Sequence, residues 1–373
     1  LGAVRIEPSL PILGAVRIEP SLPILGAVRI KPSLPILGAV RIKPSLPILG
    51  AVRIKLSRLV VTAVLVMALP ISAGAQDDSG LQIRGLTRVD TTVRLDRGGA
   101  VDLSLISGKI RVTGWDRADV KISASIESGR LRFDANSSRV SLSVEDTDDD
   151  GRRRNRHNNV GDAVYEVSVP RGSRLILEAV SGDVMARGSQ GEIEATSVSG
   201  DVDVSDGVRA VSAEAVSGSV HASQVNGNLR TETVSGEMRA ENVSGNVEAS
   251  SVSGDILLVG IQSKDVRTET VSGDITYTGT IEPSGRYGFE AHSGTIRLNI
   301  PRGSGAQFSV ETFSGDVSAD VPITIPPGRG RKEGRMDFTI GDGRARITAN
   351  TFSGQIVINT GSGSTTRRED EQD

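Results

Sequence analysis

Apolar and polar residues alternate with a period of two along most of the chain from Leu81 onward. This alternation is typical of β-strands that bury one face. It predicts strands at 92–95, 101–105, 109–112, 120–122, 131–133, 140–144, 164–169, 175–177, 336–340, 345–348 and 355–358. Glycine-containing turns separate these segments, for example at Ser107-Gly108. The body of the chain is therefore predicted to be all-β.

A second pattern, apolar–Ser–Gly–x–aliphatic, recurs at fixed intervals between residues 180 and 275. Its glycines lie 18 residues apart, at Gly182, Gly200, Gly218, Gly236 and Gly254. Half-steps of nine residues also occur, at Gly191, Gly227 and Gly245. A fixed period of this size indicates a repeat architecture.

Two columns of residues accompany the repeat. The position two residues after the glycine is always apolar, at Val184, Val202, Val220, Leu229, Met238, Val247, Ile256, Ile275, Ile296, Val317 and Ile356. The position before the serine, or before Asn226 in one copy, is occupied by Val180, Val198, Val216, Val225, Val234, Val243, Val252, Val271, His292, Phe313 and Phe352. We expect both columns to stack inward, with the polar residues between them facing outward. Val234→Asp is then expected to unfold neighbouring coils, whereas a change at outward Glu232 should have little effect.

The repeat favours a parallel β-solenoid with about 18–21 residues per coil. Each coil would hold two short strands and two corners, stacked about 4.8 Å above the previous coil. Glycine suits the corners because it turns without a Cβ clash, often at positive φ. An antiparallel β-meander with Ser-Gly turns is the alternative.

Several segments flank or interrupt the regular array. Residues 76–163 are predicted to form an N-terminal β region, with a charged and solvated loop at 145–162. Residues 164–360 are predicted to be the solenoid, and 361–373 a disordered polar tail. Larger residues near the end indicate a broader coil or a cap: Phe308, Phe313, Phe338 and Phe352.

The N-terminal part reads as a leader rather than as part of the fold. Residues 1–52 hold tandem copies of the 12-residue unit LGAVRIEPSLPI, whose prolines disfavour helices and central strands. We expect this segment not to belong to the mature protein. Residues 53–75 have the basic, apolar and A-x-A parts of a signal peptide, so cleavage after Ala75 and export are predicted. The apolar run is too short to span a bilayer, which needs about 20 residues.

Composition narrows the chemistry further. The chain has no Cys, and its three His residues lie far apart in sequence. Residues 76–373 carry 34 basic and 44 acidic residues, which argues against nucleic acid or an anionic membrane as partner. Trp115 lies in a predicted turn, where we interpret it as a packing anchor rather than as a sugar platform.

The residues resemble those of a known family. Residues 108–116, residues 165–172 and the serial Val-Ser-Gly-Asp-Val units are similar to the DUF4097 family of bacterial β-strand repeat proteins, over about 85–360. Members of that family are described as proposed adhesins. The resemblance implies a role at the cell envelope or surface, and it brings no catalytic residues with it.

We therefore expect an exported, non-enzymatic β-solenoid that acts as a scaffold or adhesin-like module of the cell envelope. Its partner would be an envelope protein or a glycan, with no cofactor and no nucleic acid. No catalytic, cofactor-binding or metal-binding residue is predicted. Two alternatives remain, namely a β-helix enzyme acting on polysaccharides and a calcium-binding β-roll. The β-roll has oxygen ligands in every rung, but here Ser219 interrupts the series of acidic residues that follow glycine.

Overall fold

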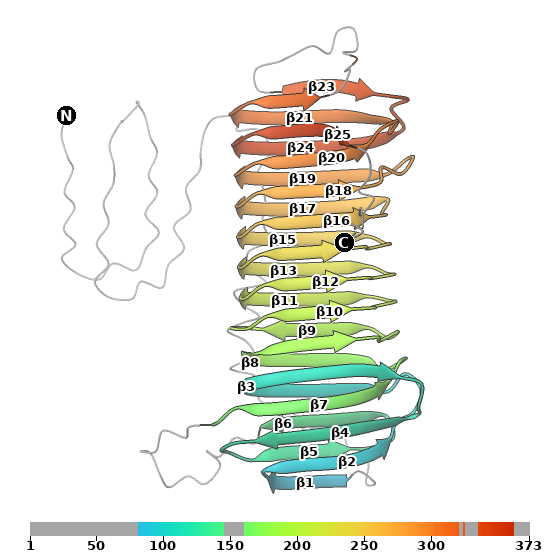
Figure 1. The fold of residues 1–373 in the computed structure, drawn as a ribbon, viewed down its shortest axis with the longest axis vertical. Coiled ribbons are helices and arrows are strands. Elements are labelled where there is room, and N and C mark those ends of the chain that lie inside the picture. The colour runs from blue at the N-terminus through green and yellow to red at the C-terminus, as the bar shows by residue number, and fades with distance from the viewer. Residues whose placement is uncertain (1–80, 145–159, 321–323, 325–334, 362–373) are drawn as a thin grey trace, which may run out of the picture. The chain divides into compact units, whose positions relative to one another are not determined.

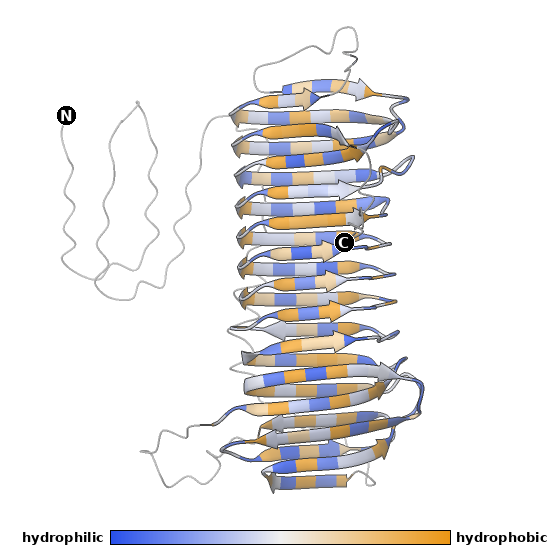
Figure 2. Cartoon of the chain, in the orientation of Figure 1, coloured by the Kyte–Doolittle hydropathy of each residue, from blue (hydrophilic) through white to orange (hydrophobic). Residues whose placement is uncertain are grey.

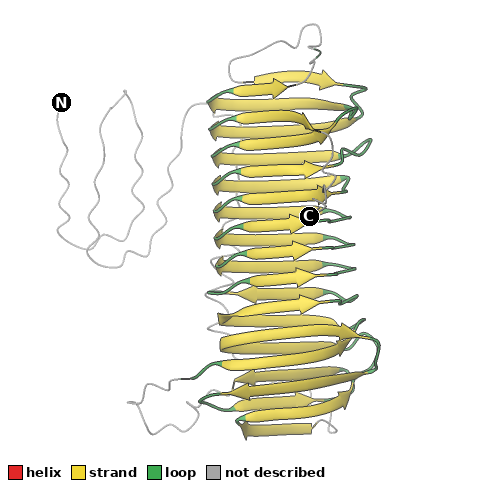
Figure 3. Ribbon diagram, in the orientation of Figure 1, coloured by secondary structure: helices red, strands yellow, loops and turns green. Residues whose placement is uncertain are grey.

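The computed structural model describes residues 81–144, 160–320, 324 and 335–361 (Figure 1). The tandem repeats at 1–52, the signal segment at 53–75, most of the charged loop and the tail lie outside these residues. Figure 3 shows that the described chain consists of strands and connecting loops. No helix capable of crossing a membrane is found within it.

Twenty-five strands form one hydrogen-bonded sheet in the described part of the chain. Their bounds are β1 Leu81–Leu86, β2 Arg88–Arg94, β3 Ala100–Trp115, β4 Asp119–Ile126, β5 Leu131–Ala135, β6 Arg139–Val144, β7 Ala163–Pro170, β8 Arg174–Arg187, β9 Ile193–Ser197, β10 Val202–Ser205, β11 Val211–Ser217, β12 Val220–Ser223, β13 Leu229–Ser235, β14 Met238–Glu241, β15 Val247–Ser253, β16 Ile256–Ile261, β17 Asp265–Ser272, β18 Ile275–Gly279, β19 Arg286–Ser293, β20 Ile296–Pro301, β21 Ala306–Ser314, β22 Val317–Asp320, β23 Arg335–Ile340, β24 Ala345–Ser353 and β25 Ile356–Gly361.

The strands form two facing walls of a parallel β-solenoid. In wall A, β9, β11, β13, β15, β17 and β19 pair in parallel, one after the other. In wall B, β10, β12, β14, β16, β18 and β20 do the same. The register follows the repeat, since Val202 lies beside Val220, and Val220 beside Met238. The predicted solenoid is confirmed, and the antiparallel meander is excluded for these coils.

Both ends of the stack depart from sequence order. The coil of β24 and β25 lies between that of β19 and β20 and that of β21 and β22. At the other end, β3 pairs in parallel with β8, although β4 to β7 intervene in the chain. Antiparallel pairs close both ends of the array. At the C-terminal end β23 pairs with β21, and at the N-terminal end β4 pairs with β7 and β5 with β6. Parallel stacking therefore also includes β3, which lies in the region 76–163 that the sequence pattern separates from the solenoid.

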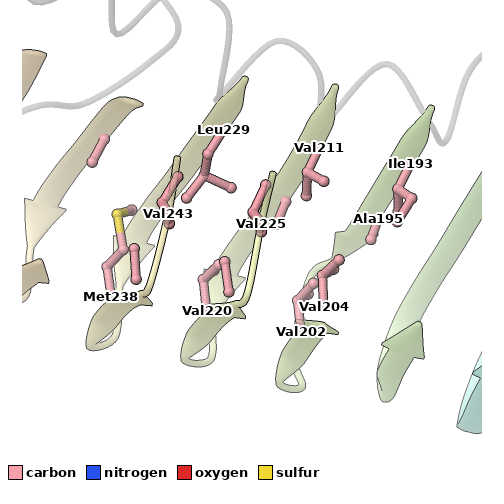
Figure 4. Packing of buried hydrophobic residues seen from close by; sticks show 14 of the residues in the cluster. Ile193, Ala195, Val202, Val204, Val211, Val220, Val225, Leu229, Met238 and Val243 are labelled. Atoms are coloured by element: carbon pink, nitrogen blue, oxygen red, sulfur yellow. The ribbon is translucent and has the colours of Figure 1, made fainter. Parts of the chain in front are cut away.

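The core is a thin layer of small and medium aliphatic side chains between the walls (Figure 4). One column inside wall B is fully buried at Val202, Val220, Met238 and Ile256. The column two residues after glycine thus faces inward in these coils, as predicted. Figure 2 shows the alternation of apolar and polar residues in every coil.

The second predicted column is mostly wrong. Val216 and Val234 are only half-buried and lie on the outside of wall A, whereas the preceding Ala215 and Thr233 are buried. Only Val225 and Val243, at the opposite corner, point into the core (Figure 4). The reason is that the Ser-Gly corner places two successive side chains, the apolar residue and the serine, on its convex side. This arrangement breaks the period of two at every corner.

The predicted group of four phenylalanines divides in the same way. Phe308 and Phe338 are both 2% exposed and stack at 4.9 Å between ring centroids inside the C-terminal end. Phe313 and Phe352 are 78% and 48% exposed on the outside. The first pair fills the closing coil, as expected of a cap, and the second pair does not.

The corner glycines are required by close packing between coils. A Cβ on Gly218 would lie 2.1 Å from the carbonyl oxygen of Gly200, and Gly200 itself lies against Gly182 in the same way. Neither Gly200 nor Gly218 has a left-handed φ, so the expected positive φ does not explain them. Positive φ does occur at other Ser-Gly corners, at Gly108, Gly273, Gly294, Gly315 and Gly354, and also at the opposite corner, 18 residues apart, at Gly188, Asp206, Gln224, Asn242 and Gly260.

Candidate functional site

An apolar column runs along the outside of wall A and of the strands that extend it, β3 and β8 at one end and β24 and β21 at the other. It has one residue per coil, immediately before the corner serine. From one end of the stack to the other, this outer apolar column consists of Ile106, Val180, Val198, Val216, Val234, Val252, Val271, His292, Phe352 and Phe313. Ladder pairing keeps its members in register, since the serine that follows each one is aligned with the serine of the next coil, as at Ser217 and Ser235. The sheet therefore presents a continuous stripe of apolar side chains to solvent, a feature that often marks an interaction site.

The stripe ends in a stack of rings. The His292 and Phe352 rings are 4.9 Å apart, and those of Phe352 and Phe313 are 4.8 Å apart, with interplanar angles of 5°. This spacing is the coil repeat itself. Because Phe313 is 78% exposed, the last ring offers a large apolar surface to a partner.

An acidic column lies beside the apolar one, two residues earlier in each strand. It consists of Glu178, Thr196, Glu214, Glu232, Ser250, Glu269, Glu290, Asn350 and Glu311. Arg230 forms ion pairs with Glu232 and Glu248, and Arg267 forms one with Glu269. Wall A therefore places charged and apolar stripes side by side.

Three glutamates of the acidic column are poorly neutralised. Burial, assisted by the neighbouring Asp102 and Glu194, raises the pKa of Glu178. Burial and the nearby Glu232 raise the pKa of Glu214 despite opposing effects of Arg230 and Ser212. For Glu290, burial and Glu269 have the same effect on the pKa. These carboxylates are ionised at a cost that a bound cation would relieve.

The apolar and acidic columns together line a hollow near the N-terminal end of the stack. Ile106, Val180, Val198 and Val216 lie along it, with Glu178, Glu214 and Val144 among the other lining residues. Its volume is about 250 Å³. Within the described residues, Glu178 has no hydrogen bond or ion pair, and Glu214 accepts only a 3.5 Å hydrogen bond from the Ser212 hydroxyl. The hollow therefore combines an apolar lining with two carboxylates that form no ion pair within the described residues.

The acidic residues that follow the corner glycines have a different role. The Asp201 carboxylate accepts a 2.8 Å hydrogen bond from the backbone N–H of Ser219 in the next coil. Asp255 does the same for the N–H of Asp274, and Asp274 for that of Thr295. Burial opposes ionisation of Asp274, but the Thr295 N–H and the Arg297 guanidinium outweigh it and lower its pKa. These side chains link successive coils.

The charged groups of this surface bear on the calcium and enzyme alternatives. In the described ranges no group of three or more His, Asp or Glu side chains is placed to hold a metal ion. Carboxylates and guanidiniums do gather in a second hollow of about 510 Å³, which includes Glu194, Arg230, Glu248 and Arg267. The Arg230 guanidinium is 2.6 Å from Glu248, so these groups neutralise one another.

Trp115 is half-buried at the end of β3. Its indole N–H donates a 2.7 Å hydrogen bond to the Asp119 carbonyl oxygen, and Arg117 lies over its ring. The side chain thus fixes the turn before β4, which agrees with the anchor interpretation.

The family model of Toastrack DUF4097 matches residues 101–359, which span β3 to β25. The chain belongs to the Toastrack DUF4097 family. The expected resemblance is thereby confirmed. No curated protein matches this Toastrack chain.

Three solved structures are similar to the Toastrack chain. A proposed lipid-binding protein from Parabacteroides distasonis is 14% identical, with a TM-score of 0.39, and the match covers 76% of this chain and 98% of that one. A proposed adhesin from Bacteroides fragilis is 12% identical, with a TM-score of 0.34 and coverage of 73% and 96%. A proposed cell adhesion protein from Clostridium sporogenes is 13% identical, with a TM-score of 0.22 and coverage of 74% and 100%.

No site residue was predicted from the sequence, and the outer apolar column of this Toastrack chain was misplaced inside the core. A signal for its true position does exist. Except for Leu105 before Ile106, the residue before each member is small or hydroxylated, as at Ala179, Ser197, Ala215, Thr233 and Ser251, and all five are buried. Small side chains fit where the two walls approach each other at the corner, so the bulkier valine is left outside.

Proposed function

We propose that this Toastrack chain is an exported, non-enzymatic scaffold that binds a partner of the cell envelope along its outer apolar column. The observation that carries the proposal is the column itself, ten apolar or aromatic rungs in register on a solvent-facing wall. Single exposed apolar residues are common on proteins, but a continuous stripe of this length is not. Export is supported by the signal-like sequence at 53–75.

The arrangement of the walls supports binding rather than catalysis. The guanidiniums of Arg230 and Arg267 are engaged by carboxylates on the same wall. A regular solenoid presents an extended, rigid surface, which suits contact over several coils. The proposal therefore assigns the interaction to a stripe along the stack and not to one cleft.

The proposal is tested by removing apolar character without changing shape. Val216→Thr, Val234→Thr and Val252→Thr, combined in one chain, should abolish capture of the envelope component that the parent chain retains. The matched control is Leu257→Thr with Val259→Thr, two residues that face outward on wall B. Equal capture by the column variant and the parent would contradict the proposal, as would equal loss in both variants. Terminal sequencing of the exported chain should find Gln76 first.

A further inference from the structure

The hollow at the N-terminal end of the outer apolar column has a more specific chemistry than the rest of the stripe. Four rungs, Ile106, Val180, Val198 and Val216, form an apolar strip along it. At about 4.8 Å per coil, the strip is about 14 Å long. Glu178 and Glu214 border it on one side, two coils apart. An occupant must therefore be apolar along one line and positively charged along a parallel line.

The sheet also restricts the backbone conformation of that occupant. At the hollow, β8, β9 and β11 pair with neighbours on both sides. Strand β3 pairs with β8 on one side and with β6 at 100–103 and β7 at 108–115 on the other, so among the described residues only the short stretch 104–107 lacks a second strand partner there. A bound peptide strand could not complete its hydrogen bonds against this surface. An α-helix satisfies its backbone internally and needs only side-chain contacts. The geometry therefore favours a helix over an extended segment.

Helical and coil spacings agree over this length. One helical turn rises about 5.4 Å, so apolar residues on successive turns drift from the four rungs by only about 2 Å in total. Glu178 and Glu214 are about 9.6 Å apart by the coil repeat, and helix residues i and i+7 are about 10.5 Å apart. Two basic residues separated by seven positions would face both carboxylates.

We propose that this hollow binds a basic amphipathic helix of a partner protein, with apolar residues on the four rungs and two Lys or Arg residues, seven apart, on Glu178 and Glu214. The inference rests on the proposed function, because it names the partner chemistry at one part of the outer apolar column. Charge favours such a helix over an anionic membrane, since the column beside the strip is acidic. Pairing with a cation would also stabilise the ionised form of both carboxylates.

The test uses the full chain and an 18-residue amphipathic helical peptide with Lys at positions i and i+7, followed by fluorescence anisotropy. The peptide should bind the parent chain, and the affinity should fall at least tenfold in Glu178→Gln with Glu214→Gln. The matched control Glu237→Gln, an exposed glutamate after a corner glycine, should bind like the parent. A peptide with Glu in place of both Lys should not bind.

Three results would overturn the inference. The first is equal affinity of the parent and the double Gln variant. The second is no binding of the Lys peptide at millimolar concentration, whether or not the chain binds phospholipid vesicles. The third is stronger peptide binding once Arg152, Arg153, Arg154 and Arg156 are replaced by Ser, which would assign the hollow to the chain's own basic run. If the peptide fails while the Val216, Val234 and Val252 variant still loses envelope capture, only this inference fails and the proposed function stands.

Discussion

At the scale of single residues, the corner glycine is set by contact with the neighbouring coil. The missing side chain makes room for a backbone carbonyl oxygen, which would lie 2.1 Å from a Cβ on Gly236 and 2.0 Å from one on Gly254. A carbonyl in a stacked ladder cannot move without disturbing the coil it belongs to. A single methyl group at one corner should therefore strain two coils at once.

Gly218→Ala is expected to lower the free energy of unfolding by at least about 2 kcal/mol, because the added Cβ meets the Gly200 carbonyl oxygen. Gly172→Ala is the matched control, since a Cβ there meets nothing within 4 Å and its φ is not left-handed. That variant should stay within about 0.5 kcal/mol of the parent. Urea unfolding followed by circular dichroism measures both. Equal urea midpoints for the two variants would contradict this expectation, because they would show that neighbouring coils can move apart at the corner to make room for the methyl group.

Glu214 should make stability depend on pH. Burial and Glu232 raise the pKa of Glu214 in the folded chain above its usual 4.5, so the folded state holds this proton more tightly than the unfolded state. Its contribution to stability is present below pH 4.5 and is lost as pH rises through the folded pKa. Glu214→Gln should therefore gain stability relative to the parent as the pH rises above 4.5.

Urea midpoints of the parent and of Glu214→Gln, measured across that pH range, test this expectation. Glu237→Gln controls for the loss of one surface charge. A difference between the parent and Glu214→Gln that does not change with pH would mean that the carboxylate ionises as freely in the folded chain as in the unfolded one.

At the scale of the element, the sequence predicts strands well and the corner poorly. Alternation places Val211, Ala213 and Ala215 on the buried face of β11, as the structure shows. The alternation of buried and exposed residues does not continue through the corner. Val216 and Ser217 both lie outside, and Val220 is the next buried side chain. The bend shifts the alternation by one step, and its mark in the sequence is a small buried residue directly before the apolar one, as at Ala215 and Val216. Alternation carried straight through the corner places Val216 and its equivalents in the core, which is why the candidate site was missed.

The same substitution on either side of the corner separates the two orientations. Val220→Thr buries a hydroxyl group at a fully buried position and should cost about 1–3 kcal/mol of unfolding free energy. Val234→Thr faces outward on wall A and should cost no more than about 0.5 kcal/mol, contrary to what the sequence pattern alone suggests. Thermal melting of both variants decides between them. A large loss of stability in Val234→Thr would mean that Val234 is buried in the core after all.

At the scale of the whole stack, sequence spacing indicates a solenoid but not the order of its coils. Regular steps of 18 residues place each coil of the central region on the one before it. Past β20, the spacing between glycines loosens. Nothing in the sequence pattern shows that the coil of β24 and β25 lies between the coil of β19 and β20 and that of β21 and β22. The order depends on how the strands of these coils pair across the stack, and no local pattern of residues encodes it.

Truncation after Arg344 tests this order, because it removes β24 and β25 and leaves β19, β20, β21 and β22 without their shared partners. The buried side chains of Ile347 and Ile356 are lost with them. Coupling between coils is local in solenoids, so hydrogen exchange should lose protection in β19 to β23 and keep it in β11 to β14. Truncation after Gly361 retains every described strand and should leave exchange unchanged. If the shorter chain still protects β21 and β22, these strands can dock directly on β19 and β20, and the inserted coil is then dispensable.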